Sequence, residues 1–294
     1  MFTSEEPTRF GIGCVGSRLL SGSLAAEKAA ALACPTSGTT LEMFRQQAGF
    51  TGSLADVRLP PGYYAAFVEL HIEQGPLLER EGIPIGAVTA IAAPAALRVR
   101  LEGQGGHAGA VLMPDRKDAL CAAAEIVLAV ERAAQATGRA DTVATTGVCQ
   151  VHPSAINSIP ARVLLEIDIR DIDLAARDGV VDAVRKAIEQ VAARRQLRFV
   201  TDVLNADAPA SAGAEVLAAI QAACQRLTLP CKLMVSRAYH DSLFMARICP
   251  MGMIFIPCKD GISHRPDEFA SPEAIEEGVK VLALTLAELA GSAS

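Results

Sequence analysis

Side chains that bind metal ions or transfer protons stand at two points where predicted strands end. The adjacent acids Glu5 and Glu6 follow the short segment Met1 to Ser4, which has the character of a strand end. His71 follows the apolar run Tyr64 to Leu70 and precedes a Gly-Pro break. One acid of such a pair can hold a metal ion while its neighbour takes a proton from water as a general base. Because strand tips often present metal-binding histidines, these residues are candidates for a metal site that activates water.

Two further histidines, His240 and His264, stand in polar loops and complete the set of candidates. The spacing is not diagnostic by itself, because the sequence has no His-x-x-x-His or similar local signature. An ordinary structural interpretation also stays open at each position. Glu5 and Glu6 would then be solvated acids in a turn, and His71 a hydrogen-bonded histidine at a strand end.

The predicted strands and helices around these residues follow two sequence patterns. In the first pattern, apolar and charged residues alternate. Leu97, Val99 and Leu101 alternate with charged neighbours, which is typical of an antiparallel sheet with one exposed face. The predicted order is strand–helix–strand–strand–helix–strand, over residues 97–102, 115–137, 142–151, 162–170, 181–191 and 197–204. This pattern predicts a compact α+β domain.

The second style consists of apolar strands and helices on either side of that domain. Met251 to Pro257 is fully apolar, as in a strand covered on both faces, and Pro272 to Ala290 reads as a helix with proline in its first turn. We therefore expect an α/β catalytic domain over residues 1–93 and 208–294. Into it is inserted an α+β domain, with a four-stranded antiparallel sheet and two helices, over residues 94–207.

Composition and charge narrow the class of protein. The 294 residues are 51% hydrophobic, which is enough for a substantial core, and the formal net charge is -6. Because no basic block is present, nucleic acid is not an expected partner. No apolar run reaches the roughly 18 residues that a membrane helix needs, and no signal peptide is visible. The eight cysteines show no Cys-x-x-Cys pair, which predicts reduced thiols in an intracellular enzyme.

Several stretches, in this order along the chain, carry a resemblance to a known family. They read MFTSEEPTRFGIGCVGSRLL, FVELHIEQGP, GGHAGAVLMP, INSIP with LEIDIRD, SRAYHDSLFMARICPMGMIFIPC and GISHRPDE. Together they resemble the dinuclear metal amidohydrolases, which include allantoate amidohydrolase and N-carbamoyl-L-amino-acid hydrolase and are related to the aminoacylases. Within that family, TSEEPTRFG, HAGAVLMP and SRAYHD are similar to the enzymes that act on ureidoglycolate. The resemblance covers essentially the whole chain.

This resemblance implies an activity, cofactors and a partner. The activity is metal-dependent hydrolysis of a linear amide C–N bond, with ureidoglycolate converted to glyoxylate, ammonia and carbon dioxide in purine and ureide breakdown. Allantoate or an N-carbamoyl amino acid is the alternative substrate. The resemblance implies two divalent metal ions, manganese with zinc as the alternative, and a homodimer paired through the inserted domain, which acts as a lid. It also implies the endoplasmic reticulum if the protein is plant-like and otherwise the cytoplasm; no targeting segment is visible.

The resemblance also implies which residues carry the chemistry. Glu5 resembles the general base, and Glu6, His71 and His264 resemble metal ligands. His107, in the inserted domain, resembles a catalytic residue that reaches the site of the partner subunit. There its imidazole can stabilise the developing oxyanion.

A second set resembles substrate-binding residues. Asn157 and Arg170 belong to the inserted domain, and an arginine can bind a carboxylate with two parallel hydrogen bonds. Gln74 and His240 match substrate-contacting positions, and Tyr239 stands where the ureidoglycolate enzymes differ from their relatives.

One departure from the family concerns its N-terminal motifs. Members carry a His-x-Asp motif and an Asp-Gly motif before the Glu-Glu pair, which supply a histidine ligand and the aspartate that bridges the two metals. Neither precedes Glu5, and Met1 matches an internal position of the family. We therefore expect a catalytic domain that is incomplete at the N-terminus, and we hypothesise that this chain alone does not hold two metals. An inactive remnant, acting only as a dimerising or binding protein, is the second alternative.

Nothing singles out His152, which is expected to lie in a loop.

Overall fold

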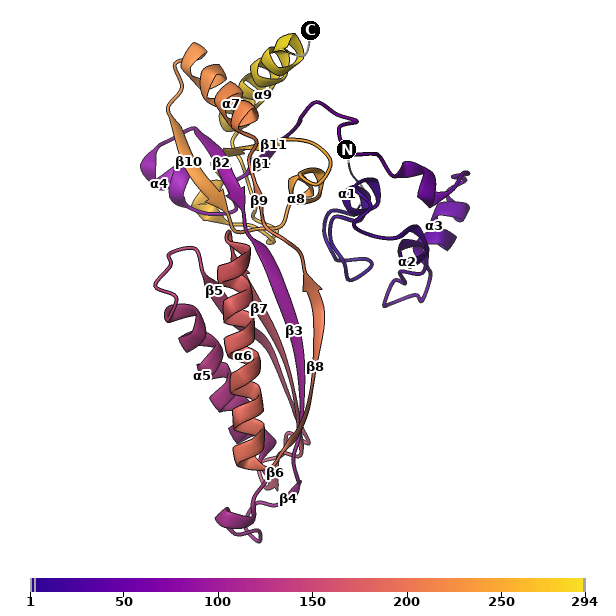
Figure 1. Ribbon diagram of the computed structural model, residues 1–294, viewed down its shortest axis with the longest axis vertical. Helices are drawn as coiled ribbons and strands as arrows, with labels where there is room; N and C mark the ends of the chain where they lie inside the picture. The colour runs from indigo at the N-terminus through magenta and orange to yellow at the C-terminus, as the bar shows by residue number, and fades with distance from the viewer. Residues whose placement is uncertain (1, 3, 293–294) are drawn as a thin grey trace. The chain divides into compact units, whose positions relative to one another are not determined.

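A computed structural model describes residue 2 and residues 4–292 of the chain (Figure 1). The chain divides into two compact units, residues 1–91 with 210–294, and residues 92–209. The boundaries expected from the sequence, after residues 93 and 207, each lie two residues from these divisions. Within the described residues, no helix is both long and apolar enough to cross a membrane.

The first unit is built on a mixed sheet. Its helices and turns are α1 (Val15–Leu20), α2 (Ala26–Ala30), α3 (Leu41–Gln47), η1 (Leu54–Val57), α4 (Leu77–Glu81), α7 (Ala214–Arg226), α8 (Asp241–Met245), η3 (Lys259–Gly261) and α9 (Pro272–Ser292). Its strands are β1 (Phe67–Ile72), β2 (Ile85–Ile91), β9 (Ala210–Ser211), β10 (Cys231–Ser236) and β11 (Met251–Ile256). The sheet runs in the order β1-β11-β2-β10, with β9 pairing β2. The β1–β11 and β2–β10 pairs are parallel, and the β11–β2 pair is antiparallel.

Alternation along β1 gives this sheet two different faces. Val68, Leu70 and Ile72 pack against a core that includes residues of α7 and α9, which lie against the sheet in Figure 1. Because neighbouring strand residues point to opposite faces, Glu69 and His71 lie on the other side, where α8 contacts β1 and β11. The strand β11 is buried along its whole length, as its apolar sequence predicts.

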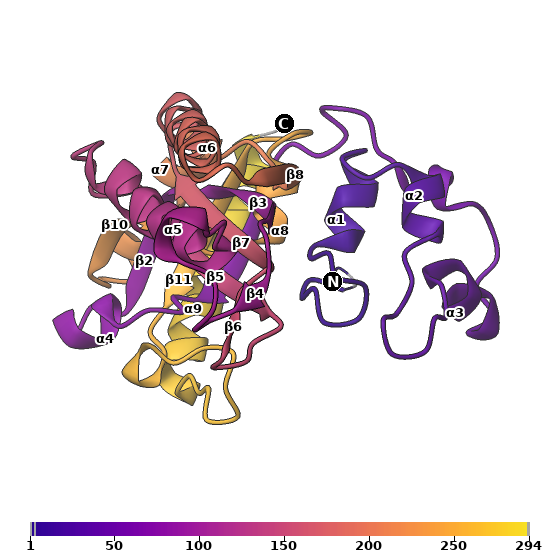
Figure 2. The same cartoon turned by 90° about the horizontal axis from the view of Figure 1, so that it is seen from below.

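The second unit is a four-stranded antiparallel sheet with two long helices. Its elements are β3 (Ala93–Glu102), β4 (Gly106–His107), η2 (Met113–Asp115), α5 (Ala119–Gln135), β5 (Val143–His152), β6 (Ser158–Ile159), β7 (Arg162–Asp171), α6 (Leu174–Arg195) and β8 (Arg198–Ala206). The sheet has the order β5-β7-β3-β8, and α5 and α6 lie side by side on one face (Figures 1 and 2). The predicted four-stranded antiparallel sheet is therefore confirmed.

The core of the second unit follows the predicted alternation. Leu97, Val99 and Leu101 are buried under the helices with Leu165 and Ile167 of β7. The charged residues between them occupy the other face, where ion pairs such as Arg98 with Glu166 join neighbouring strands. The short strands β4 and β6 pair with each other as a separate ribbon.

Some local expectations are wrong. The sequence predicts a capping box of Thr39 and Glu42, but Thr40 caps α3 by accepting a hydrogen bond from the backbone N–H of Met43. Glu42 instead binds Arg45, because a charged partner one turn away is a stronger ligand.

Two other expectations also differ from the structure. Helix α5 begins at Ala119, because the Asp118 side chain accepts from two backbone N–H groups there. The predicted strand end over Met1 to Ser4 falls partly outside the described residues, at Met1 and Thr3. Phe2 and Ser4 are not in a strand.

Candidate functional site

The end of β1 and the start of α8 bring three metal-binding side chains together. Ligand atoms of Glu69, His71 and His240 all lie within 4.8 Å of one another. Glu69 and His71 share a face because they are two residues apart on one strand. The rings of His71 and His240 meet edge to face, with centroids 4.7 Å apart. Sequence reasoning missed Glu69, although its spacing from His71 was a usable signal.

Hydrogen bonds orient the two imidazoles of this group. The Nδ1 of His71 donates to the backbone oxygen of Ile72 at 2.8 Å, since a carbonyl oxygen only accepts, and this leaves Nε2 as the lone-pair nitrogen. The Nε2 of His240 lies 2.8 Å from the Oγ of Ser236. The Nδ1 of His240 is buried and has no hydrogen-bond partner among the described residues. Each imidazole is therefore oriented by a hydrogen bond at one of its two nitrogens, as metal-binding histidines commonly are.

The carboxylate of Glu69 is fixed in the same way. Its Oε2 accepts hydrogen bonds from the backbone N–H and the hydroxyl of Ser242, at 2.9 and 2.6 Å. Its Oε1 lies 4.0 Å from the Nδ1 of His240. Burial, with a smaller contribution from His71, lowers the pKa of His240 to about 3, so the imidazole is neutral, as a ligand must be. A carboxylate and two imidazoles, one with an unsatisfied buried nitrogen, fit a divalent metal ion.

Two more carboxyl groups, those of Glu5 and Asp241, lie near Glu69, His71 and His240. Burial raises the pKa of Glu5, and the negative charges of Glu6, Asp241 and Glu69 add to this while His71 opposes it. Burial also raises the pKa of Asp241 to about 6. Glu5 thus holds a proton more strongly than an exposed glutamate does, which suits a general base.

The backbone near Glu5 and the side chain of Asp241 are both held by residues of α1 or its N-cap. The backbone oxygen of Glu5 accepts from the N–H of Cys14 at 2.8 Å. The Oγ of Ser17 donates to the carboxylate of Asp241. The N-terminal segment is therefore anchored to the start of α8.

The two other residues expected to be metal ligands form a separate pair. The Nε2 of His264 lies 2.8 Å from the Oε1 of Glu6, and both side chains are exposed. His264 has a left-handed backbone, with φ of 59°. Neither residue belongs to the group of Glu69, His71 and His240. Their role as ligands stays a prediction.

Gln74 and Tyr239, expected to contact substrate, lie in the same unit. The Nε2 of Gln74 donates to the Oγ of Ser263 at 3.0 Å, while its Oε1 is buried without a hydrogen-bond partner among the described residues. That oxygen is available to a ligand that donates a hydrogen bond. The ring of Tyr239 stacks on Phe244, and the guanidinium of Arg18 lies over both rings. Tyr239 is thus held in one orientation.

His107 and Asn157 meet at the β4–β6 ribbon of the second unit. They line a cavity of about 430 Å³ together with His152. His107 is exposed, and its Nδ1 accepts from the N–H of Gly109 at 3.0 Å. His152 is the last residue of β5, opposite Arg162, so its expected position in a loop is wrong. The strand begins and ends one residue later than the predicted range of 142–151.

Arg170 lies at the other end of the same sheet. It pairs across the sheet with Pro94, whereas Arg162 pairs with Glu102. Eight residue steps along β7 correspond to roughly 26 Å, so the second unit does not bring Arg170 near His107. Two hydrogen bonds, at 2.7 and 3.1 Å, join the guanidinium of Arg170 to Asp168.

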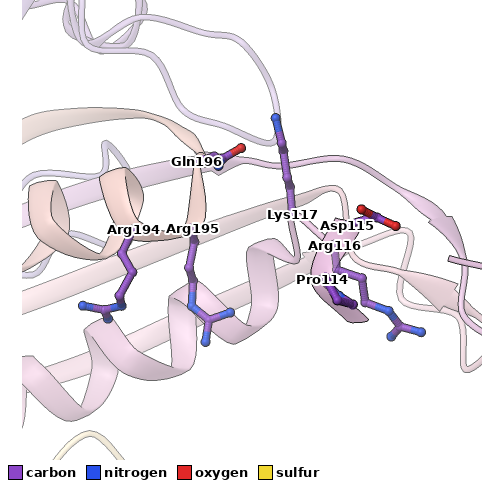
Figure 3. A pocket seen from close by; sticks show the side chains of 7 residues that line it. All are labelled: Pro114, Asp115, Arg116, Lys117, Arg194, Arg195 and Gln196. Atoms are coloured by element: carbon purple, nitrogen blue, oxygen red, sulfur yellow. The ribbon is translucent and has the colours of Figure 1, made fainter. Parts of the chain in front are cut away.

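A second cavity of the second unit, of about 630 Å³, carries mainly basic side chains (Figure 3). Arg194 and Arg195 form ion pairs with Glu125, and Arg116 donates to backbone oxygens of its own loop. Figure 3 shows Lys117 pointing away from Arg194 and Arg195. These cations do not converge on one point, so the cavity is not a candidate active site.

Comparison with known proteins identifies relatives of the whole described chain. The model of peptidase family M20/M25/M40 matches residues 3–288. Proteins named ureidoglycolate hydrolase are 55% identical in Oryza sativa subsp. japonica and 52% identical in Arabidopsis thaliana. Each alignment covers 98% of this chain, and 60% or 62% of the plant protein. This chain therefore spans about three fifths of the length of these relatives.

A bacterial relative and a solved structure extend the comparison. The N-carbamoyl-L-amino acid amidohydrolase of Geobacillus stearothermophilus is 40% identical, over 98% of this chain and 70% of that protein. The crystal structure of AtUAH in complex with (S)-hydroxyglycine superposes with a TM-score of 0.86 at 51% identity. That match covers 98% of this chain and 70% of the other. The chain belongs to peptidase family M20/M25/M40.

Proposed function

We propose that the protein is a metal-dependent amidohydrolase that acts on ureidoglycolate. The observation that carries this proposal is the group of Glu69, His71 and His240, whose ligand atoms lie within 4.8 Å of one another. The substrate is supported by the two plant relatives named ureidoglycolate hydrolase. It is also supported by the crystal structures of AtUAH with (S)-hydroxyglycine and with glyoxylate.

We propose manganese as the metal, with zinc as the alternative. Glu69, His71 and His240 would hold one ion, and Glu6 with His264 would contribute to a second. Stoichiometric binding of two manganese ions would overturn the hypothesis that this chain alone does not hold two metals. A metal ion bound there supplies Lewis acidity and makes water a better nucleophile. Proton transfer and substrate binding would be carried out by the side chains of this chain.

The side chains of the first unit can perform the proton transfers and orient the substrate. The carboxylate of Glu5 accepts the proton of the attacking water and returns it to the nitrogen that leaves. The unsatisfied Oε1 of Gln74 accepts a hydrogen bond from a ureido N–H group. Tyr239, whose ring stacks on Phe244, supplies a hydroxyl for the polar groups of the substrate.

A homodimer through the second unit is part of the same proposal. Leu112, Met113 and Ile156, which flank the β4–β6 ribbon, expose 71%, 73% and 103% of their surface. Large exposed apolar side chains in one region favour contact with another protein. His107 lies on this ribbon, and we propose that it serves the site of the partner subunit.

A comparison of substrates tests the proposal. Ammonia release is measured with ureidoglycolate, allantoate and an N-carbamoyl-L-amino acid, with manganese present. We expect release from ureidoglycolate at least tenfold faster than from the other two. The bacterial relative makes the N-carbamoyl amino acid the main alternative, and faster release from that substrate would replace ureidoglycolate in the proposal. A chain that binds manganese and releases ammonia from none of them would support the non-catalytic alternative.

A further inference from the structure

A line of hydrogen bonds joins the end of β1 to the loop that carries His264. The Nε2 of Gln74 donates to the Oγ of Ser263 at 3.0 Å, and that hydroxyl donates to the Oε2 of Glu268 at 2.8 Å. The first of these bonds connects residues 189 positions apart in the sequence. Ser263 therefore uses its hydroxyl as acceptor and donor at once, between the strand of His71 and the loop of His264.

Glu268 also fixes the backbone of His264 directly. Its Oε2 accepts from the backbone N–H of His264 at 3.1 Å, so one oxygen receives two hydrogen bonds. The hydrogen bond from Ser263 is the main reason that the pKa of Glu268 lies below its usual value. His264 has a φ of 59°, and Gln74 at the other end has a φ of 55°. Residues with a Cβ atom rarely adopt this conformation, so other contacts must maintain it.

The neighbouring acid of this loop has a different partner. Asp267 pairs with Arg265 at 2.7 Å, and both side chains are more than half exposed. The loop therefore offers two adjacent carboxylates, of which Glu268 alone is joined to Ser263 and His264 by the hydrogen bonds described here. This difference supplies a matched control.

We propose that Ser263 and Glu268 are positioning residues that hold the imidazole of His264 against Glu6, in register with the strand that carries His71. The inference rests on the proposed function, because it gives His264 a role in metal binding. Residues that orient metal ligands from behind commonly change metal affinity by ~10- to 100-fold when removed. The effect should pass through hydrogen bonding and not through the charge of Glu268.

The test measures manganese affinity of the whole chain, by electron paramagnetic resonance of free Mn²⁺. We expect Glu268→Ala to weaken the affinity of the His264 site by at least tenfold. Glu268→Gln should stay within about threefold of the original, because both hydrogen bonds end on a single oxygen that the amide oxygen can replace. Asp267→Ala should leave the affinity unchanged. Amide hydrogen exchange at His264 should be faster in Glu268→Ala than in Glu268→Gln.

Two results would overturn the inference. The first is a Glu268→Ala chain with the original manganese affinity. The second is a Glu268→Gln chain as weak as Glu268→Ala, which would show that only the charge matters. If Glu268→Ala keeps its affinity while ureidoglycolate is still hydrolysed, this inference fails and the proposed function stands. If Glu268→Ala loses affinity in a chain that hydrolyses no ureide, the proposed function fails and the positioning role stands. A starting chain that binds no manganese contradicts both.

Discussion

The Nδ1 of His240 lies 4.0 Å from the Oε1 of Glu69, and it has no hydrogen-bond partner among the described residues. This separation is too long for a hydrogen bond. A buried nitrogen without a partner is costly, and a cation held by both atoms would remove that cost. The positions of these two atoms therefore fit a site that binds a cation.

Metal binding should stabilise the first unit. We expect Mn²⁺ at 100 times its dissociation constant to add about 2.7 kcal/mol to the free energy of unfolding. His71→Ala should reduce this gain, because it removes one of the three converging ligands. Thermal melts with manganese and with a chelator measure the difference. His152→Ala, in the second unit, is the control, and an equal manganese effect in His71→Ala would disprove this ligand set.

Glu5→Gln should remove the general base without removing the metal. We expect kcat for ureidoglycolate to fall by roughly 10²- to 10⁴-fold, with manganese affinity unchanged. Steady-state kinetics and a metal titration on the same preparation check both parts. Glu27→Gln, an exposed acid of α2, should behave like the original protein. A fall in kcat below tenfold would take the general-base role away from Glu5.

The pH dependence of activity follows from the same carboxylate. A base acts only when ionised, and burial raises the pKa of Glu5. Activity should therefore be lost on the acid side at a pH above the value of 4.5 for an ordinary glutamate. A pH profile of kcat/KM tests this expectation. Full activity maintained down to pH 4.5 would contradict it.

The burial of Asp241 predicts a pH-dependent stability. Its pKa is about 6 in the folded chain and 3.8 in a model compound, so the folded state holds the proton more tightly. The contribution to stability is fully present below pH 3.8 and is lost as the pH rises through about 6. The loss is at most about 3 kcal/mol, from two pKa units.

Asp241→Asn isolates this effect. The amide does not ionise, and its oxygen can still accept the hydrogen bond from Ser17. The variant should therefore gain stability relative to the original protein between pH 4 and pH 7. Denaturant unfolding at both pH values gives the comparison. A difference between the two proteins that does not change with pH would show that Asp241 is not the group responsible.

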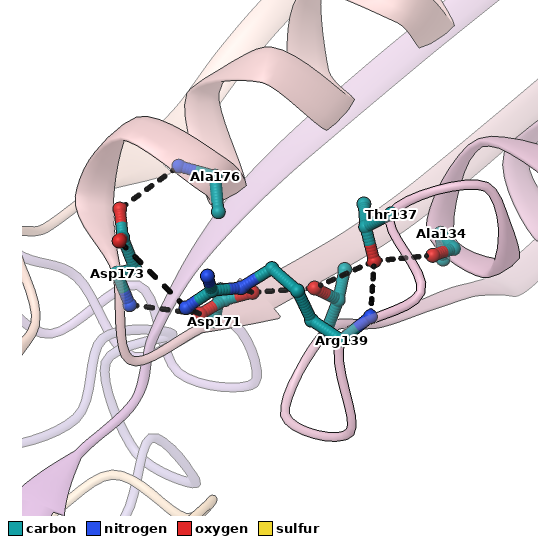
Figure 4. Close-up of polar contacts among 7 residues, drawn as sticks. Ala134, Thr137, Arg139, Asp171, Asp173 and Ala176 are labelled. Atoms are coloured by element: carbon teal, nitrogen blue, oxygen red, sulfur yellow. Dashed lines mark hydrogen bonds and ion pairs between the residues drawn. The ribbon is translucent and has the colours of Figure 1, made fainter.

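Asp171 should stabilise the second unit in the opposite pH range. Burial acts to raise its pKa, but hydrogen bonds from Thr142 and the N–H of Asp173, with the nearby Arg139, outweigh burial and lower it (Figure 4). The contribution of Asp171 to the free energy of unfolding is present above pH 3.8, which is its pKa in the unfolded chain. The contribution is lost as the pH falls through the lower pKa of Asp171 in the folded chain.

The matching variant is Asp171→Asn. We expect it to cost about 2 kcal/mol of unfolding free energy at pH 7, because a buried charge-assisted network loses its acceptor. The cost should shrink in acid. Asp182→Asn, an exposed acid of α6, should change stability little. Equal stability of the Asp171→Asn and original chains at pH 7 would show that the network contributes nothing.

The fold was predictable where local pattern decides the structure. The alternation of Leu97, Val99 and Leu101 required a sheet with one covered face, and the structure has it. Strand β10 was not predicted, because Cys231–Ser236 is short and its residues mix polar and apolar character. Tertiary pairing with β2 makes it a strand.

The candidate site was predictable only in part. The importance of His71 was visible from its place at a strand end, and Glu69 was detectable from the period of that strand. The meeting of His71 with His240 depends on where α8 lies against β1, and no local pattern encodes that contact. The bond between Gln74 and Ser263 has the same long-range origin.

The most direct test of the account is the formation of glyoxylate from ureidoglycolate by the manganese-loaded protein. We predict steady production of glyoxylate and ammonia that stops on chelation and returns when manganese is restored. His71→Ala should give neither product. Binding of manganese without glyoxylate formation, or the same rate in His71→Ala, would contradict the proposal that these residues form the active site of an amidohydrolase.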